Sequence, residues 1–217
     1  MRWGGPWPFA AFLLAMLVAL PVLVVASSVF APAGEVWRHL SQTVLSTYIL
    51  NSLWLLVGVG AGTLVVGVGT AWLVTMYRFP GRRSFEWLLL LPFAMPAYVL
   101  AYTYTGLFEF AGPIQTVLRD LFGWTTRRDY WFPEVRSLGG AIWMMTFVLY
   151  PYVYLLSRAA FLEQSVAVLE VSRTLGRTRL RTFLSVALPL ARPGIVVGLT
   201  FALIETLNDF GTVQYFA

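Results

Sequence analysis

Long stretches without a charged residue alternate with short polar segments along this chain. No Asp, Glu, Lys or Arg lies between Arg2 and Glu35, Arg38 and Arg78, Glu86 and Glu109, or Arg136 and Arg158. Each stretch is longer than the roughly 20 residues that a helix needs to cross about 30 Å of hydrocarbon. A helix also satisfies its own backbone polar groups, as lipid requires. The pattern therefore predicts an all-α membrane protein, a polytopic bundle of transmembrane helices.

The hydrophobic stretches predict about five spans in one transmembrane domain that covers residues 1–217. The expected spans are 7–30, 50–76, 87–106, 139–156 and 193–213. The connections are a short loop at 31–49, a tight basic turn at 77–86, a long polar loop at 107–138 and an arginine-rich segment at 157–192. The first stretch could be a signal peptide cleaved near Ala31-Pro32-Ala33, but it exceeds the usual apolar core of about 7–15 residues. We expect a retained anchor.

Composition supports this class and excludes others. The chain is 59% hydrophobic and 12% charged, which leaves too little polar surface to cover a soluble domain. The absence of cysteine excludes disulfides and thiolate metal sites. The net charge of +5 would suggest a nucleic-acid partner in a soluble protein. Here all basic residues are arginines that flank the predicted spans, so we expect no nucleic acid to bind.

The arginines predict the orientation. With the N-terminus inside, the cytoplasmic side holds ten: Arg2, Arg78, Arg82, Arg83, Arg158, Arg173, Arg177, Arg179, Arg181 and Arg192. The outer side holds five: Arg38, Arg119, Arg127, Arg128 and Arg136. Cytoplasmic loops carry the excess of basic residues in membrane proteins. We therefore expect a multi-pass protein of a bacterial inner membrane with a cytoplasmic N-terminus. His39 lies in an outer loop, where we expect a surface residue and not a ligand.

Two spans have unusual residues. The second contains Gly58, Gly60, Gly62, Gly67 and Gly69. Small residues allow helix backbones to approach closely in a membrane, so we expect this span to pack centrally. The third span carries Pro92 and Pro96, which remove backbone donors and should kink or break the helix. A kink that shapes packing and a break that lines a pathway both remain open.

The arginine-rich segment is patterned for helices. Apolar residues recur at three- and four-residue spacing: Val166, Leu169, Leu175, Leu180, Phe183, Leu184 and Leu188. Gly176 interrupts this pattern and suits a turn between two short helices, while Pro189 and Pro193 lead into the next span. A plain connection would be much shorter, so the length predicts a partner. The alternative is a basic amphipathic segment that lies on anionic lipid.

The same segment resembles a known motif. Glu170-Val171-Ser172, three residues, Gly176, nine residues, Val186, one residue and Leu188-Pro189 match the spacing of the EAA loop of ATP-binding-cassette importer permeases. The family pattern has two alanines where this chain has Val171 and Ser172, and isoleucine where it has Val186.

The resemblance implies a MetI-like permease fold and a coupling helix that sits in a cleft of an ATPase subunit. Glu170 would lie at the contact, and Gly176 would permit the turn. The chain has no phosphate-binding G-x-x-x-x-G-K-[ST] motif, so we expect a transport subunit that is not an enzyme and binds no cofactor. ATP would be used by the partner. The implied partners are cassette ATPase subunits, an extracellular or periplasmic binding protein, a second permease half and membrane lipid.

Two further stretches, 90–102 and 205–213, resemble the iron(III)-import branch of these permeases. The substrate implied is iron(III), and thiamine, phosphonate and polyamine importers are alternatives within the class. Permeases of this branch are commonly duplicated chains of about twice this length, so we expect an N-terminal portion of a longer protein.

Glu205 and Asp209 are two carboxylates in the last predicted span. Counted from Pro193, they lie about 18 and 24 Å along the helix, and their spacing places them on one helix face. Carboxylates at such depth are costly and usually face a bundle interior or a water-filled path. They could line a cation path or form an interhelical clamp, and no metal site is assigned to them. They would also suit a secondary transporter driven by an ion gradient, which leaves the arginine-rich segment unexplained.

Overall fold

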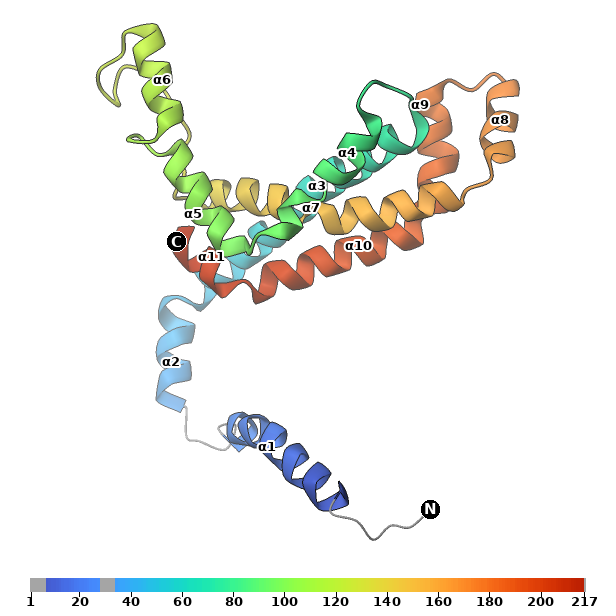
Figure 1. Ribbon diagram of the computed structural model, residues 1–217. Coiled ribbons are helices and arrows are strands. Elements are labelled where there is room, and N and C mark those ends of the chain that lie inside the picture. The colour runs from blue at the N-terminus through green and yellow to red at the C-terminus, as the bar shows by residue number, and fades with distance from the viewer. Residues whose placement is uncertain (1–6, 28–33, 217) are drawn as a thin grey trace. The chain divides into compact units, whose positions relative to one another are not determined.

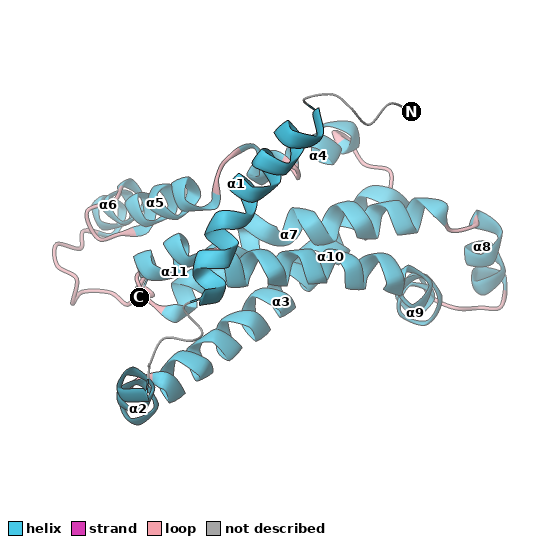
Figure 2. Cartoon of the chain, turned by 90° about the horizontal axis from the view of Figure 1, so that it is seen from below, coloured by secondary structure: helices cyan, strands magenta, loops and turns pink. Residues whose placement is uncertain are grey.

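The computed structural model describes residues 7–27 and 34–216, and within these ranges the regular elements are all helical (Figures 1 and 2). The predicted all-α membrane fold is therefore confirmed. The chain divides into two compact units, Met1–Tyr48 and Ile49–Ala217, and each is described by itself.

The first unit contains α1 (Trp7–Ser27) and α2 (Gly34–Thr43). Helix α1 is apolar on all sides and long enough to cross a membrane. The end of the predicted span 7–30 and Ala31-Pro32-Ala33 lie outside the described residues. The expectation of a plain loop at 31–49 is wrong, because α2 fills most of it with an amphipathic helix. His39 is an exposed residue of α2, as predicted.

The core of the second unit consists of α3 (Leu45–Met76) from residue 49 onward, α7 (Leu138–Glu163) and α10 (Leu188–Asn208). Helix α10 packs along α7 for most of its length (Figure 1). A Cβ atom on Gly67 of α3 would lie 2.7 Å from Val153 of α7, and one on Gly58 would lie 2.7 Å from Ile142. The expected central packing of the glycine-rich span is thus confirmed.

The third predicted span is broken at its prolines. It consists of α4 (Arg82–Leu88), the 3-10 helix η2 (Leu91–Ala94) and α5 (Ala97–Phe108). The two flanking parts, 82–94 and 97–122, differ in direction by 100°. Within residues 7–27 and 34–216, four helical stretches are long and apolar enough to span a membrane, and this bent pair would make a fifth. The sequence therefore predicted the break, and the helix also begins earlier than expected, inside the basic turn 77–86.

Several predicted boundaries differ from the structure. The polar loop 107–138 contains an amphipathic helix, α6 (Pro113–Phe122), which ends at Gly123 with φ 70°. Helix α7 continues to Glu163, so the arginine-rich segment begins as part of a span. The segment then forms α8 (Val166–Thr174), α9 (Arg179–Thr182) and the π-helix η3 (Phe183–Ala187). Helix α10 begins before residue 193 and ends at Asn208, and α11 (Phe210–Phe216) follows.

Candidate functional site

The centre of the arginine-rich segment is a helix–turn–helix around Gly176. Gly176 has φ 82°, a left-handed conformation that glycine adopts without steric cost. The N–H of Arg177 donates to the carbonyl of Ser172 at 3.3 Å, which closes the end of α8 in the manner of a Schellman motif. Thr178 then caps α9 by accepting from the N–H of Arg181. The predicted turn between two short helices is confirmed.

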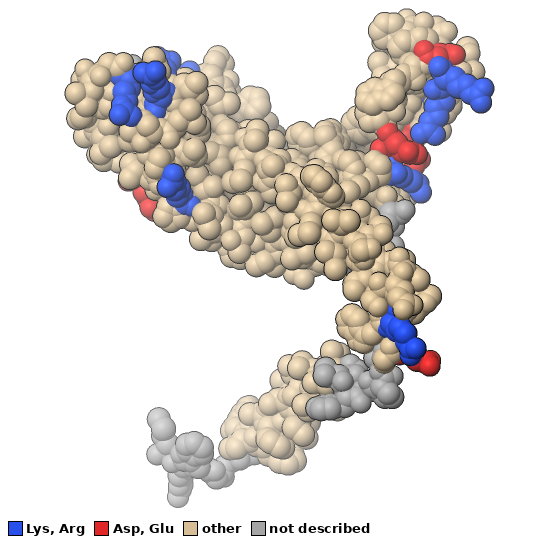
Figure 3. Space-filling view, turned by 180° about the vertical axis from the view of Figure 1, so that it is seen from behind, with Lys and Arg blue, Asp and Glu red and all other residues tan. Residues whose placement is uncertain are grey.

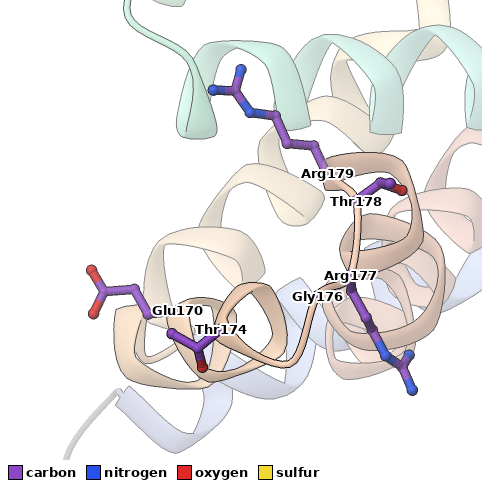
Figure 4. A pocket seen from close by; sticks show the side chains of 6 residues that line it. All are labelled: Glu170, Thr174, Gly176, Arg177, Thr178 and Arg179. Atoms are coloured by element: carbon purple, nitrogen blue, oxygen red, sulfur yellow. The ribbon is translucent and has the colours of Figure 1, made fainter.

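An open pocket of about 670 Å³ lies between α8 and α9. Its lining residues are Glu170, Thr174, Gly176, Arg177, Thr178 and Arg179 (Figure 4). The side chains of Glu170 and Arg177 point outward to opposite sides of the turn. Among the described residues, Glu170 forms no ion pair or hydrogen bond, so its carboxylate is available to a partner.

Apolar side chains of this segment are exposed to an unusual degree. Val171 is 57% exposed, Leu175 76% and Leu180 67%. Large apolar residues gathered on one surface indicate an interaction site. The side chains of Val166 and Leu169 lie outside the described part of the structure. The amphipathic pattern of the sequence thus gives a surface that stays uncovered in the single chain.

The remaining motif residues have a different place. Val186 lies in η3, and Leu188 and Pro189 form the first turn of α10. All three are half-buried, and Pro189 occupies a position where a helix tolerates proline. The structure therefore separates the motif into a part with the exposed Glu170, Val171 and Gly176, and a base that begins the next span.

The base is attached to two long helices. Phe183 of η3 packs against Trp72 of α3, with ring centroids 4.8 Å apart, and Trp72 contacts Phe161 of α7 at 5.3 Å. The side-chain amide of Gln164 donates to the carbonyl of Ala187 at 2.8 Å. Trp72, Phe161 and Gln164 cannot be identified as contact residues from the sequence, because a residue in or beside an apolar run carries no signal of what it contacts.

The broken span is held against α7 near this site. Glu86 of α4 pairs with Arg158 of α7 at 3.1 Å and with Arg82 at 3.2 Å. Tyr154 of α7 donates to the backbone carbonyl of Glu86 at 3.3 Å. On the same segment Pro92 lies in the first turn of η2 and Pro96 is the N-cap of α5, and the ring of Phe93 between them contacts that of Tyr152 of α7 at 4.6 Å.

Glu205 and Asp209 do not share one helix, so that expectation is wrong. Helix α10 ends at Asn208, and Asp209 accepts from the N–H of Thr212 at 2.9 Å and from its hydroxyl at 2.5 Å. This short-range capping competes with continuation of the helix and starts α11. Glu205 stays exposed on α10. No cluster of three metal-ligating side chains occurs within 7–27 and 34–216.

The segment between α5 and α7 is fixed by polar contacts. Arg136 pairs with Glu109 at 2.7 Å and lies over the ring of Tyr215. The hydrogen bond and charge of Glu109 raise the pKa of Arg136. Backbone N–H groups of Thr126 and Thr125 donate to Asp129 and lower the pKa of its carboxyl. These hydrogen bonds therefore stabilise the turn at every pH above the usual pKa of a carboxyl group. The stabilisation is lost only as pH falls through the lowered pKa of Asp129.

On the second unit, charged side chains gather in two regions of the face that Figure 3 shows. One lies over α8 and α9, and the other over the segment around α6, while the surface between them is largely uncharged. In the second region the ring of Trp124 stacks on those of Phe122 and Tyr130, with ring centroids 4.7 Å apart in both contacts. An uncharged band between two charged ends is the distribution that a bilayer imposes.

Comparison with known proteins gives one family. A model described as "binding-protein-dependent transport system inner membrane component" matches residues 63–217. The sulfate transport system permease protein CysT of Salmonella typhimurium is 32% identical over 158 residues, covering 70% of this chain and 52% of the relative. The molybdenum transport system permease protein ModB of Escherichia coli is 31% identical over 175 residues, 81% of this chain and 71% of the relative.

A third relative covers nearly the whole chain. The Fe(3+)-transport system permease protein FbpB 2 of Haemophilus influenzae is 28% identical over 212 residues, which are 95% of this chain and 37% of the relative. The chain spans about half the length of the sulfate relatives from Salmonella typhimurium and Escherichia coli.

Proposed function

Since this chain belongs to the family of binding-protein-dependent transport system inner membrane components, we propose that it is the permease subunit of an importer driven by separate cassette ATPase subunits. The observation that carries the proposal is the helix–turn–helix of α8 and α9. Its exposed carboxylate Glu170 and its turn glycine Gly176 stand at the family spacing, beside exposed apolar residues and on a base attached to two spans. A substrate-binding protein, a second permease half and lipid complete the assembly.

The proposed coupling is a rigid-body movement. The ATPase contacts α8, with Glu170 and the exposed Val171 and Leu175 at the contact. Closure of the ATPase subunits shifts α8 and α9, and η3 passes the shift to Trp72 of α3 and to Gln164 at the end of α7. Packed interfaces transmit such shifts because close-packed side chains deform little.

We propose that the N-terminus and the α8–α9 region face the cytoplasm and that the α6 region faces the outside. The arginine count supports this orientation. The α6 region is then the part of the second unit that a substrate-binding protein can reach. Its stacked aromatic rings and the Glu109–Arg136 pair give it a fixed surface.

For the cargo we propose iron(III). Stretches 90–102 and 205–213 resemble the iron(III) branch, and a relative named for Fe(3+) transport aligns over 95% of the chain, as relatives named for sulfate transport also do. Glu205 adds a physical argument. An exposed carboxylate along a span is costly in lipid, so it faces water or a partner. In a water-filled path it attracts a cation and repels an oxyanion. Sulfate and molybdate, named for other relatives, are the competing cargoes.

The test is uptake into proteoliposomes that contain the chain with its ATPase and second half, supplied with loaded binding protein. Radioactive iron(III), sulfate and molybdate are compared with and without ATP inside. Accumulation of iron alone supports the full proposal. Accumulation of sulfate or molybdate keeps the importer and rejects iron. Uptake that follows an ion gradient and ignores ATP rejects the importer in favour of a secondary transporter.

A further inference from the structure

The contact between α8 and the rest of the chain is narrow. Helix α8 packs against α9 and η3. The turn between α8 and α9 is open, since a Cβ atom on Gly176 would have no neighbour within 4 Å. Packing at the turn therefore does not fix the angle between the two helices, and glycine adds conformational freedom there. Something else has to hold α8 in place.

Two buried hydroxyl groups join the helices across this turn. The side-chain oxygens of Ser172 on α8 and Thr182 on α9 are 3.1 Å apart, and the residues are 6% and 3% exposed. A hydrogen bond shielded from water is stronger than an exposed one, and a buried hydroxyl without its partner is costly. The second link, from Arg177 to Ser185, is exposed to solvent. The buried pair is therefore the firmer connection.

The pair continues directly into the base. Thr182 precedes Phe183, whose ring packs on Trp72 of α3, and η3 ends at Ala187, which accepts from Gln164. A force on α8 can thus reach α3 through Ser172, Thr182 and Phe183, beside the two-residue connection 164–165 that joins α8 to α7. The EAA pattern has alanine at the place of Ser172, and alanine has no hydroxyl to offer. The pair of hydroxyl groups is therefore a feature of this chain and not of the motif.

We propose that the Ser172–Thr182 hydrogen bond is the joint that locks α8 to α9, and that both are positioning residues for energy coupling. The proposal rests on the function above. Without the bond, α8 still meets the ATPase but turns about Gly176, so that part of the movement is lost. Loss of about 1 kcal/mol raises the population of unlocked α8 roughly fivefold.

The variants separate the hydroxyl from the shape of the side chain. Thr182→Val removes the hydroxyl and keeps the volume, Thr182→Ser keeps the hydroxyl and removes a methyl group, and Ser172→Ala removes the other partner. In the complete complex, with whichever of iron(III), sulfate or molybdate the wild type accumulates, the quantity measured is cargo taken up per ATP hydrolysed. We expect a fall of up to roughly fivefold for Thr182→Val and Ser172→Ala. Thr182→Ser should keep the wild-type ratio.

The Ser172–Thr182 hydrogen bond can also be tested without the ATPase. In the purified chain, trypsin should cut after Arg177 faster in Thr182→Val than in the wild type or Thr182→Ser. In the complete complex, a double cysteine variant, Ser172→Cys with Thr182→Cys, should keep the wild-type ratio of cargo to ATP when a disulfide joins the two residues and lose it when the disulfide is reduced. The chain has no other cysteine that could compete for this disulfide.

Three results would overturn the joint: equal cleavage in Thr182→Val and wild type, an unchanged ratio in Thr182→Val, or equal losses in Thr182→Val and Thr182→Ser. If the wild-type chain recruits no ATPase, the proposed function is wrong. The trypsin cleavage rates of the purified chain would then still test the Ser172–Thr182 hydrogen bond.

Discussion

The hydroxyl of Tyr150 on α7 donates a 2.8 Å hydrogen bond to the backbone carbonyl of Leu89, at the break of the third span. In a continuous helix that carbonyl would accept from Phe93, but the N–H of Phe93 donates to Leu90 instead. One turn further along α7, the hydroxyl of Tyr154 donates to the backbone carbonyl of Glu86. In a continuous helix that carbonyl would accept from the N–H of Leu90, but this N–H donates to the carbonyl of Trp87 instead. The two tyrosines replace the helical bonds that the break removes, as a membrane interior requires.

Tyr150→Phe should therefore destabilise the protein by about 1–3 kcal/mol, because it leaves the half-buried carbonyl of Leu89 without this partner. Thermal unfolding in detergent measures this, with the exposed Tyr98→Phe as the matched control. An equal loss of thermal stability in both variants would show that the hydrogen bond from Tyr150 to Leu89 does not stabilise the protein.

The proposed orientation predicts which residues react from outside. In this cysteine-free chain, Thr125→Cys should be labelled in intact cells by a thiol reagent that does not cross the membrane. Thr174→Cys should be labelled only after the cells are opened. Both side chains are exposed, so accessibility reports the side of the membrane. Labelling of Thr174→Cys in intact cells, with Thr125→Cys labelled only in opened cells, would show that the protein has the opposite orientation.

Glu170→Lys with Gly176→Val should abolish ATP-dependent uptake while the protein still inserts. Lysine reverses the charge at the proposed ATPase contact, and valine cannot adopt φ 82° without strain. Membrane abundance and co-purified ATPase are measured beside uptake. The charge-matched control is Glu35→Lys on exposed α2, which should transport normally. Uptake at the wild-type rate in the double variant would refute the docking role.

Glu205→Gln should lower iron uptake per molecule and leave abundance and ATPase binding unchanged if Glu205 lines a water-filled cation path. Asp209→Ala is a different test, because Asp209 caps α11 through Thr212. Loss of the cap should destabilise the protein by about 0.5–2 kcal/mol and so lower the amount of folded protein. Normal uptake in Glu205→Gln would reject the path, and normal abundance in Asp209→Ala would reject the structural role.

The sequence alone determined the class of this protein. Uncharged stretches long enough to cross lipid, arginines at their ends and glycines in the second span follow from the bilayer and need no knowledge of tertiary contacts. The break at Pro92 and Pro96 and the turn at Gly176 were also predictable, because proline and glycine limit the backbone locally.

What the sequence could not give were the contacts between elements. It placed Glu205 and Asp209 on one helix, because the hydropathy pattern does not register that Asp209 caps a new helix through Thr212. It treated Ser172 as a small substitute for alanine, since only the fold brings Thr182 beside it. Nor did it connect Trp72 with Phe183, more than a hundred residues apart. Local preferences set where helices form, whereas packing in three dimensions decided which of their side chains transmit, cap or bind.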